Sequence, residues 1–199
     1  MSHTHLTAGI DVGTSSVKVA VARSAAGESG QIISKCHQRI RRRSTIDVVR
    51  AAFDEALASA GTKRDDFDYV CTTGDADSIE FATGHLYGMT THARGAIHLA
   101  PEARAVLDLG ALHSRALKIN DYGRVLHHGM TSQCASGTGQ FLESIARYLG
   151  VPLDDVGEMS ARSGTGEQCS SICAVLAETD VINMVSRGIS TEDILKGIH

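Results

Sequence analysis

Two short segments of the sequence combine a carboxylate with a glycine, and each follows an apolar, strand-like run. Asp11 and Gly13 come after LTAGI, and Asp108 and Gly110 come after ARAVL. A glycine lets backbone N–H groups approach phosphate oxygens without a Cβ in the way. An aspartate cannot face phosphate directly, but its oxygens suit a Mg²⁺ ion held through water. The two segments therefore predict a site for the phosphates of a magnesium nucleotide.

The first of these segments carries extra donors for phosphate. Thr14 and Ser15 follow Gly13, and their hydroxyl groups add to the backbone N–H groups. The chain has no Walker-A lysine motif, so a P-loop nucleotidase is not predicted. The alternative is a pair of ordinary hairpin turns. The matching positions of the two segments in an internal repeat favour the phosphate site.

Two cysteines stand next to predicted helix starts. Cys134 lies three residues before Gly137-Thr138-Gly139, which opens an amphipathic helix over residues 139–149. Cys173 lies near the start of a helix predicted over 171–187, with Ser170 or Ser171 as its N-cap. The positive end of a helix favours a thiolate, which is the form that binds metal.

A closed zinc or iron–sulfur site usually needs four ligands, so two cysteines are not enough. A two-fold or pseudo-two-fold dimer would supply the other two. The alternative is that both cysteines are simply buried at helix starts. Cys36 and Cys71 lie in strand-like runs and are predicted in the core, and Cys169 is a less favoured ligand near Cys173.

The elements that must position these residues form a repeat. Each half of the chain reads strand, turn, strand, turn, strand, followed by helices. The predicted strands are 6–12, 17–24, 31–40 and 68–72 in the first half and 103–109, 115–120 and 124–129 in the second. The predicted helices are 46–60 (N-cap Ser44 or Thr45, end at Gly61), 92–99, 139–149, 153–162, 171–187 and, capped by Thr191, 191 onward.

Composition bounds the class of protein. The chain has 199 residues, 42% hydrophobic and 21% charged, with a net charge of −4, so it is not predicted to bind nucleic acid. No segment reads as a membrane span or a signal peptide, and five cysteines without an export signal indicate reduced thiols in the cytoplasm. The basic run at Arg39 and Arg41–Arg43 is either a contact patch or, as favoured, a solvated strand end.

Pro101 marks the predicted boundary between the two halves. The expected α/β architecture has one subdomain over residues 6–101 and a second over 102–199, which carries Cys134 and Cys173. The second half ends without a closing strand after its last helix. We therefore expect the second subdomain to be incomplete.

Several of these segments resemble known families. GIDVGTSSVKVAV resembles the first phosphate loop of the actin/hexokinase/Hsp70 ATPase superfamily, which implies two ribonuclease-H-like subdomains with ATP in the cleft between them. SQCASGTGQFLE, SSICAVLAETDVI and TTGDADSIEFATG…THARGA resemble segments of a narrower family, over residues 9–199. That family comprises the ATP-dependent activators of 2-hydroxyacyl-CoA dehydratases and the ATPase subunits of benzoyl-CoA reductase.

The resemblance implies roles for individual residues. Cys134 and Cys173 would be ligands of one [4Fe–4S] cluster shared between two subunits. ATP with Mg²⁺ would be the nucleotide, with Asp11 and Asp108 as catalytic residues. The implied nucleotide-binding residues are Gly13, Thr14, Ser15, Gly110, Gly137, Thr138 and Gly139.

The second phosphate loop departs from the family pattern. The activators read Asp-Ile-Gly-Gly-Gln-Asp-Ser-Lys, whereas here Ala111, Leu112 and His113 replace Gly, Gln and Asp. A leucine and a histidine cannot position water and Mg²⁺ in the same way. Whether this subunit hydrolyses ATP or is a passive partner therefore stays open.

This departure resembles the smaller, divergent ATPase-like subunits of the family. The implied activity is that of a subunit of an ATP-dependent oxidoreductase that passes low-potential electrons in anaerobic aromatic degradation. The implied partners are a related larger ATPase subunit, two ring-reducing subunits and reduced ferredoxin. The alternatives are an activator of a 2-hydroxyacyl-CoA dehydratase, a small-molecule kinase of the same superfamily and a non-catalytic scaffold.

Overall fold

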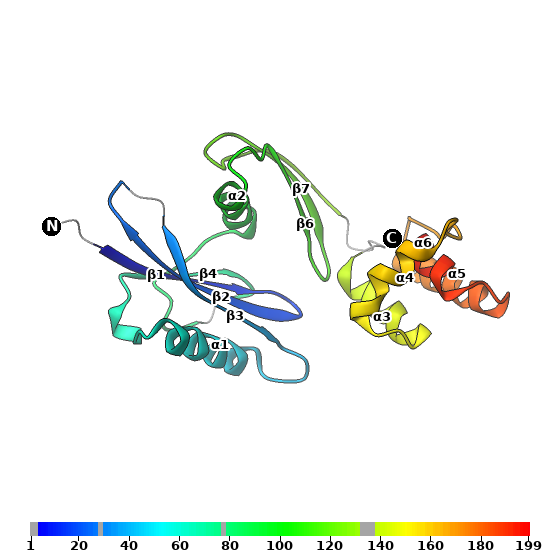
Figure 1. Cartoon of the computed structure of the whole chain (residues 1–199), viewed down its shortest axis with the longest axis horizontal. Helices are drawn as coiled ribbons and strands as arrows, with labels where there is room; N and C mark the ends of the chain where they lie inside the picture. The colour runs from blue at the N-terminus through cyan, green and yellow to red at the C-terminus, as the bar shows by residue number, and fades with distance from the viewer. Residues whose placement is uncertain (1–3, 28–29, 77–78, 132–137) are drawn as a thin grey trace. The chain divides into compact units, whose positions relative to one another are not determined.

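The computed structural model describes residues 4–27, 30–76, 79–131 and 138–199. These residues form two compact units, Met1–Arg104 with Ile119–Leu126, and Ala105–Lys118 with His127–His199. Both units combine helices and strands (Figure 1). In the described part of the chain no helix is both long and apolar enough to cross a membrane.

The first unit is built on a five-stranded sheet with the order β3-β2-β1-β4-β5. Strand β1 (Thr4–Val12) pairs antiparallel with β2 (Ser16–Ala25), which pairs antiparallel with β3 (Gln31–Arg39). On its other side β1 pairs parallel with β4 (Tyr69–Gly74), and β4 with the short β5 (Gly84–His85). The four longer strands confirm the sequence prediction, and β5 was not predicted.

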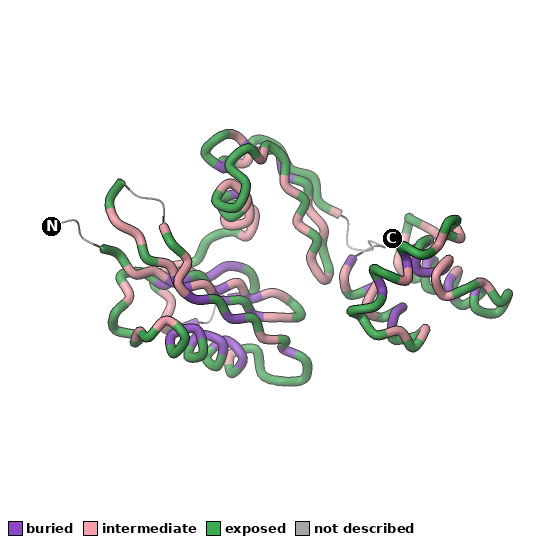
Figure 2. Tube along the Cα trace, viewed as in Figure 1, coloured by how far each residue is buried: buried purple, intermediate pink, exposed green. Residues whose placement is uncertain are grey.

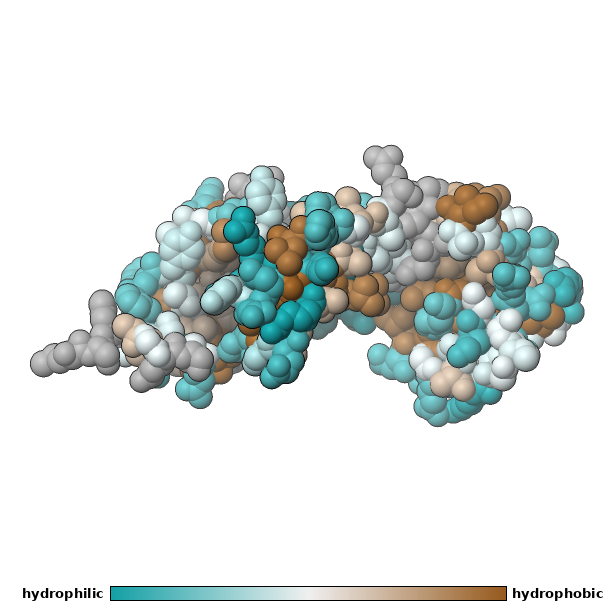
Figure 3. All heavy atoms as spheres, turned by 90° about the horizontal axis from the view of Figure 1, so that it is seen from above, coloured by the Kyte–Doolittle hydropathy of each residue, from teal (hydrophilic) through white to brown (hydrophobic). Residues whose placement is uncertain are grey.

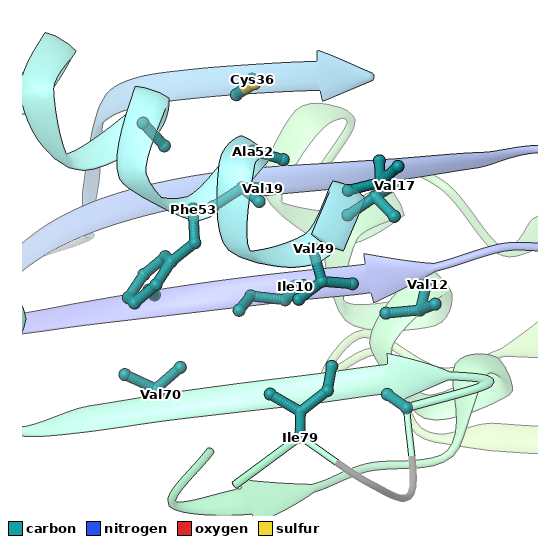
Figure 4. Packing of buried hydrophobic residues seen from close by; sticks show 14 of the residues in the cluster. Ile10, Val12, Val17, Val19, Cys36, Val49, Ala52, Phe53, Val70 and Ile79 are labelled. Carbon is teal, nitrogen blue, oxygen red and sulfur yellow. The ribbon is translucent and has the colours of Figure 1, made fainter. Parts of the chain in front are cut away.

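Helix α1 (Thr45–Ala60) covers one face of this sheet. It begins after Ser44 and ends at Gly61, whose φ of 65° needs a residue without a Cβ penalty, so the predicted helix is confirmed. Its predicted apolar face is buried against β1, β2 and β3, and Val49, Ala52 and Phe53 point into this core (Figure 4). Phe53 stacks on Phe81 with ring centroids 5.0 Å apart. Burying a phenylalanine side chain stabilises a fold by about 1.5–3 kcal/mol.

Helix α2 (Gly88–Leu99) lies on the other face of the sheet (Figure 1). The prediction placed its start at His92, four residues too late. Residues 88–91 include a glycine and two threonines, which are weak helix formers, yet the helix runs through them. The Thr91 hydroxyl donates to the Gly88 carbonyl oxygen, and the Thr73 hydroxyl of β4 lies 3.4 Å from the Thr91 hydroxyl. Tertiary packing here overrides local propensity. The 3₁₀ turn η1 (Arg64–Asp66) precedes β4.

A second, three-stranded sheet has the order β6-β7-β8. Its strands are β6 (Ala105–Leu109), β7 (Ser114–Ile119) and β8 (Val125–Met130), as predicted to within two residues. Strands β6 and β7 form an antiparallel hairpin. Leu117 and Ile119 on β7 are buried, whereas β6 and β8 show mostly half-buried and exposed residues (Figure 2).

The rest of the second unit is helical. Its elements are α3 (Gly139–Leu149), η2 (Leu153–Asp155), α4 (Val156–Arg162), α5 (Ala174–Ser186) and α6 (Thr191–Ile198). They share a core that includes Phe141, Ile145, Val181, Ile194 and Leu195. The helix predicted over 153–162 is split into a 3₁₀ turn followed by α4.

One predicted cap and one predicted helix start in this unit were wrong, whereas the start of α6 at residue 191 was predicted correctly. Helix α6 is capped by Ser190 rather than Thr191, because the Ser190 hydroxyl accepts from the Asp193 N–H at 3.2 Å. Helix α5 begins three residues later than predicted and has Cys173 as its N-cap. Ser170 is not the cap, because its hydroxyl accepts from the Ile172 N–H and bends the segment before the helix.

Candidate functional site

The first Asp-x-Gly segment forms the turn between β1 and β2. The Gly13 N–H donates to the Ser16 carbonyl oxygen at 3.0 Å. A Cβ on Gly13 would lie 3.2 Å from that oxygen, so the tight turn favours glycine. Thr14 and Ser15 lie at the tip of the turn. Because the Gly13 N–H is occupied, the N–H and hydroxyl groups of these two residues are the donors that the turn can offer to a phosphate.

Asp11 lies opposite Lys18 in the β1–β2 ladder. The Lys18 Nζ is 2.9 Å from Asp11 Oδ2, and both side chains reach solvent. Sequence reasoning missed Lys18, although its signal was present. A basic residue seven positions after the aspartate (11 to 18) becomes its cross-strand partner in a hairpin of this length.

The end of β4 closes against the end of β1. The Asp75 N–H donates to the Val12 carbonyl oxygen at 2.8 Å, and Gly74 has a φ of 78°. A Cβ on Gly74 would lie 2.2 Å from the Val12 oxygen, so no other residue fits this close approach. The carboxyl ends of parallel strands are where α/β sheets bind ligands, and the pairing of β1 with β4 places Asp11 at such an end.

A cavity of about 670 Å³ opens beside Asp11 and Lys18, between the sheet and α2. It lies on the face opposite α1, because alternate residues of β1 point to opposite faces: Ile10 and Val12 pack in the core and Asp11 faces the other way. Thr73, Thr91 and Arg94 also line it. A carboxylate, two cations and hydroxyl groups together suit an anionic ligand that is accompanied by a hydrated cation.

The second Asp-x-Gly segment repeats the first in its backbone. The Gly110 N–H donates to the His113 carbonyl oxygen at 2.8 Å, and a Cβ on Gly110 would lie 2.8 Å from that oxygen. Asp108 lies opposite Arg115, with Oδ2 and Nη1 3.5 Å apart. Arg115 therefore matches Lys18. The divergent residues 111–113 keep the turn but offer no hydroxyl groups at the positions of Thr14 and Ser15.

The start of α3 is bonded to this second turn. The Gly139 N–H donates to the Gly110 carbonyl oxygen at 3.0 Å, and the Gln140 N–H donates to the Ala111 carbonyl oxygen at 2.8 Å. A Cβ on Gly139 would lie 3.3 Å from the Gly110 oxygen. The structure therefore brings the predicted site residues Gly110 and Gly139 together, with Thr138 as the N-cap of α3. The loop carbonyls satisfy N–H groups that a helix start otherwise leaves unpaired.

The predicted cluster ligands are only partly described. Cys134 and Gly137 lie outside the described residues. Cys173 is the N-cap of α5, so it lies at the helix N-terminus as expected, and its carbonyl accepts from the Ala177 N–H. Within the ranges that the structure describes, no three His, Cys, Asp or Glu side chains gather to hold a metal ion.

Three other cysteines are poor thiolates. Burial, with Glu55 as a further cause, raises the pKa of the Cys36 thiol to about 11. Burial also raises the pKa values of Cys71 and Cys169, and the nearby Asp180 carboxylate adds to the effect at Cys169. Cys36 is in the core as predicted. The prediction for Cys71 was wrong, because Cys71 is only partly buried and faces the cavity rather than α1.

Comparisons with known proteins identify the family of the chain. A model of the BadF/BadG/BcrA/BcrD ATPase family matches residues 8–199. A benzoyl-CoA reductase subunit of Thauera aromatica is 56% identical over 98% of this chain and 68% of that protein. The (R)-2-hydroxyglutaryl-CoA dehydratase activating ATPase of Acidaminococcus fermentans is 31% identical over 97% of this chain and 72% of that protein.

Two solved structures share the fold over nearly the whole chain. One is component A of (R)-2-hydroxyglutaryl-CoA dehydratase from Acidaminococcus fermentans, with a TM-score of 0.88 and 30% identity over 98% of this chain and 73% of that one. The other is the activator of 2-hydroxyisocaproyl-CoA dehydratase from Clostridium difficile with bound ADPNP. It has a TM-score of 0.85 and 30% identity over 98% of this chain and 70% of that one.

Proposed function

The chain belongs to the BadF/BadG/BcrA/BcrD ATPase family, and we propose that it is the ATP-binding, electron-transfer subunit of a benzoyl-CoA reductase. Its fold is that of the actin/hexokinase-like ATPases. The observation that carries the proposal is the 56% identity to the benzoyl-CoA reductase subunit of Thauera aromatica over 98% of the chain. The identity to the dehydratase activators is 31–33%, so the reductase is favoured over that alternative.

Each Asp-x-Gly turn is proposed as a phosphate-binding element, the first in the ribonuclease-H-like subdomain proposed for residues 6–101 and the second in the one proposed for 102–199. Asp11 and Asp108 would hold Mg²⁺ through water, and Thr14 and Ser15 would bind phosphate oxygens. Lys18 Nζ lies 2.9 Å from Asp11 Oδ2. The lysine is a flexible point charge, so it would also be a candidate to contact phosphate oxygens held by the first turn.

The proposed cluster site uses Cys134 and Cys173 as thiolate ligands, with a related larger ATPase subunit supplying the other two. A [4Fe–4S] cluster bound there would supply one-electron transfer. Cys173 fits this role because it lies at the positive end of α5. Its apolar neighbours Ile172, Val175 and Leu176 are 80%, 65% and 49% exposed, which supports burial of this surface against a second subunit.

The contact between the second turn and α3 supports coupling of nucleotide to redox state. Gly110 and Ala111 carbonyls hold the first N–H groups of α3, and the segment that carries Cys134 leads directly into this helix. A nucleotide that shifts the second turn would shift the helix start with it. Such a shift changes hydrogen bonding and burial near the cysteines, which are the properties that tune a cluster potential.

The proposed setting is the cytoplasm of an anaerobic cell. Reduced ferredoxin would be the electron donor, and two further subunits would hold benzoyl-CoA and reduce its ring. Whether this subunit itself turns over ATP depends on the divergent residues 111–113. A subunit that binds nucleotide without hydrolysing it would still pair with an active relative.

The test is anaerobic co-purification with the larger ATPase subunit encoded by the same organism, followed by iron, sulfide and EPR analysis. About four irons per pair are expected for one shared cluster, and Cys134→Ser and Cys173→Ser should each lose them. Cys169→Ser is the matched control, because that thiol lies four residues from Cys173 and should keep the iron. A stable pair without iron under strict anaerobiosis would overturn the proposal in favour of a kinase-like or scaffold role.

A further inference from the structure

Four of the five residues 39–43 are arginines, in a chain whose net charge is −4. Arg39, Arg41, Arg42 and Arg43 are all exposed, at the end of β3 and in the turn that leads to α1. We call residues 39–43 the arginine turn. Together with Gln38 and Glu55 these arginines line a hollow of about 710 Å³. Neither the nucleotide site nor the cluster site uses them.

The turn has a backbone that does not suit an arginine. The Arg43 N–H donates to the Ile40 carbonyl oxygen at 3.1 Å, and Arg41 has a φ of 53°. Among the described residues, Arg41 is the one non-glycine residue with a positive φ. A left-handed conformation costs a residue with a Cβ about 1–2 kcal/mol, so stability alone would favour glycine. Such outliers point to a side chain that is kept for function.

The arginine turn is held to the first phosphate-type turn by the backbone. The Ile40 N–H donates to the Ser15 carbonyl oxygen at 2.9 Å, and Arg39 pairs with Ser16 in the β2–β3 ladder. A molecule bound to the arginines would therefore lie at the same end of the sheet as residues 13–16.

The contacts in the hollow do not favour a compact anion such as a phosphate. Arg43 already donates to the Gln38 side-chain oxygen and to the Arg39 carbonyl oxygen. The Glu55 carboxylate lies in the same hollow and accepts from Gln38 at 2.7 Å, so it would repel an anion seated on the floor. The side chains of Arg39, Arg41 and Arg42 make no hydrogen bond or ion pair within the described ranges.

Exposed arginines of this kind suit a protein surface. The guanidinium is a planar fork that binds carboxylates in a bidentate way, and arginine is enriched at protein interfaces. A chain of net charge −4 repels an acidic protein except where positive charge is concentrated, so the cluster both attracts and orients such a partner. We propose that the arginine turn is a docking surface for the acidic face of a partner protein.

The test measures binding of a fluorescein-labelled polyglutamate peptide to the full chain by fluorescence anisotropy. Arg41→Gly/Arg42→Gln removes two charges, and glycine tolerates the φ of 53°, so the turn should stay folded. We expect this variant to bind the peptide roughly tenfold more weakly than the unmodified chain. The difference should shrink as salt rises from about 0.02 to about 0.15 M, because screening shortens the range of the attraction.

Arg23→Gln/Arg124→Gln is the matched control. It removes the same charge from two exposed arginines of the first unit outside the turn, and it should keep the peptide affinity. Equal weakening in both double variants would reduce the effect to net charge and overturn the proposal. The proposal would also be overturned if Arg41→Gly/Arg42→Gln weakened the binding of tripolyphosphate but not the binding of the peptide.

A third outcome concerns the edge of the sheet. Strand β3 is an edge strand of the sheet. The alternative role of the positive charge is therefore to prevent β3 from pairing with a strand of another copy of the chain. Size-exclusion chromatography tests this reading. If Arg41→Gly/Arg42→Gln self-associates but binds the peptide as before, the arginines protect the edge and the docking surface is overturned. None of these measurements uses nucleotide or iron, so they are independent of the proposed function.

Discussion

The two Asp-x-Gly hairpins have the same backbone turn in different surroundings. In each, the glycine N–H donates to the carbonyl three residues later, and the aspartate lies opposite a basic residue. Strand β1 lies between β2 and β4, and Ile10 is 1% exposed. In the described part of the chain β6 pairs with β7 alone, and Leu107, which matches Ile10, is 74% exposed.

This difference separates local from non-local causes. The turn depends on a glycine and on a hairpin of fixed length, so both segments form it. Burial depends on which elements flank the strand, so only β1 is in a core. Apolar residues that reach the surface are visible in both parts of the chain (Figure 3).

The largest expected effect comes from the matched pair Ile10→Ala and Leu107→Ala. Ile10→Ala should lower the free energy of unfolding by about 3 kcal/mol, because it leaves a cavity under α1. Leu107→Ala should change it by less than about 0.5 kcal/mol, because the side chain is mostly in solvent. Urea denaturation checks both. Equal losses would show that β6 is covered as β1 is, and would break the comparison.

The second effect concerns the two aspartates. Asp11→Asn should weaken binding of ADPNP in Mg²⁺ by about 30-fold. The variant keeps the hydroxyl donors of the first turn but loses the carboxylate that would hold the cation. Asp108→Asn should weaken it by about threefold, because residues 111–113 have already lost polar groups. Calorimetric titration measures both affinities.

Titration without Mg²⁺ is the control for these two variants, since Asp11→Asn should then lose no affinity relative to the unmodified chain. ATP turnover of the assembled complex adds a second reading. Turnover lost in Asp108→Asn would show that this subunit hydrolyses ATP, and unchanged turnover would show a passive partner.

The third effect tests how tightly each turn is closed. Gly110→Ala should cost about 2 kcal/mol and Gly13→Ala about 1 kcal/mol, because the added Cβ would lie 2.8 Å and 3.2 Å from the facing carbonyl oxygen. Gly157→Ala in α4 is the control. Its Cβ meets nothing within 4 Å, so it should stabilise the helix by up to about 1 kcal/mol. Thermal unfolding gives the three values, and a reversed order of the two turn variants would contradict the geometry.

The smallest effect is a pH dependence carried by the core of the first unit. Cys36 has a pKa of about 11 against an ordinary value of 9.0, because burial disfavours its thiolate. The stability that this gives is complete below pH 9 and is lost as the pH rises from 9 to 11. At pH 10 the loss should be about 1 kcal/mol.

Urea unfolding of the unmodified chain and of Cys36→Ala at pH 8 and pH 10 isolates this contribution. The difference in unfolding free energy between the two proteins should shrink at the higher pH. If the difference is constant, the Cys36 thiol titrates alike in the folded and unfolded chain, and its burial contributes no pH dependence.

The elements whose signals are local could be predicted from the order of the residues alone. Helix α1 has its N-cap, its apolar face and its terminal Gly61 within one short segment, and all three were predicted. The two Asp-x-Gly turns were likewise predicted, because a glycine and a short hairpin fix their geometry. The start and end of α3 were also predicted, because the signals for both lie within or next to the helix in the chain.

Contacts between residues that are distant in the chain could not be predicted in this way. Lys18 faces Asp11 because of strand register, and Gly74 is required because β4 ends against Val12. Gly139 contacts Gly110 although 29 positions separate them in the chain. Cys71 faces the cavity because of the alternation of β4, and Cys173 is the N-cap of a helix that begins three residues later than predicted. Such contacts depend on register and packing between distant segments, which a local pattern of residue types does not encode.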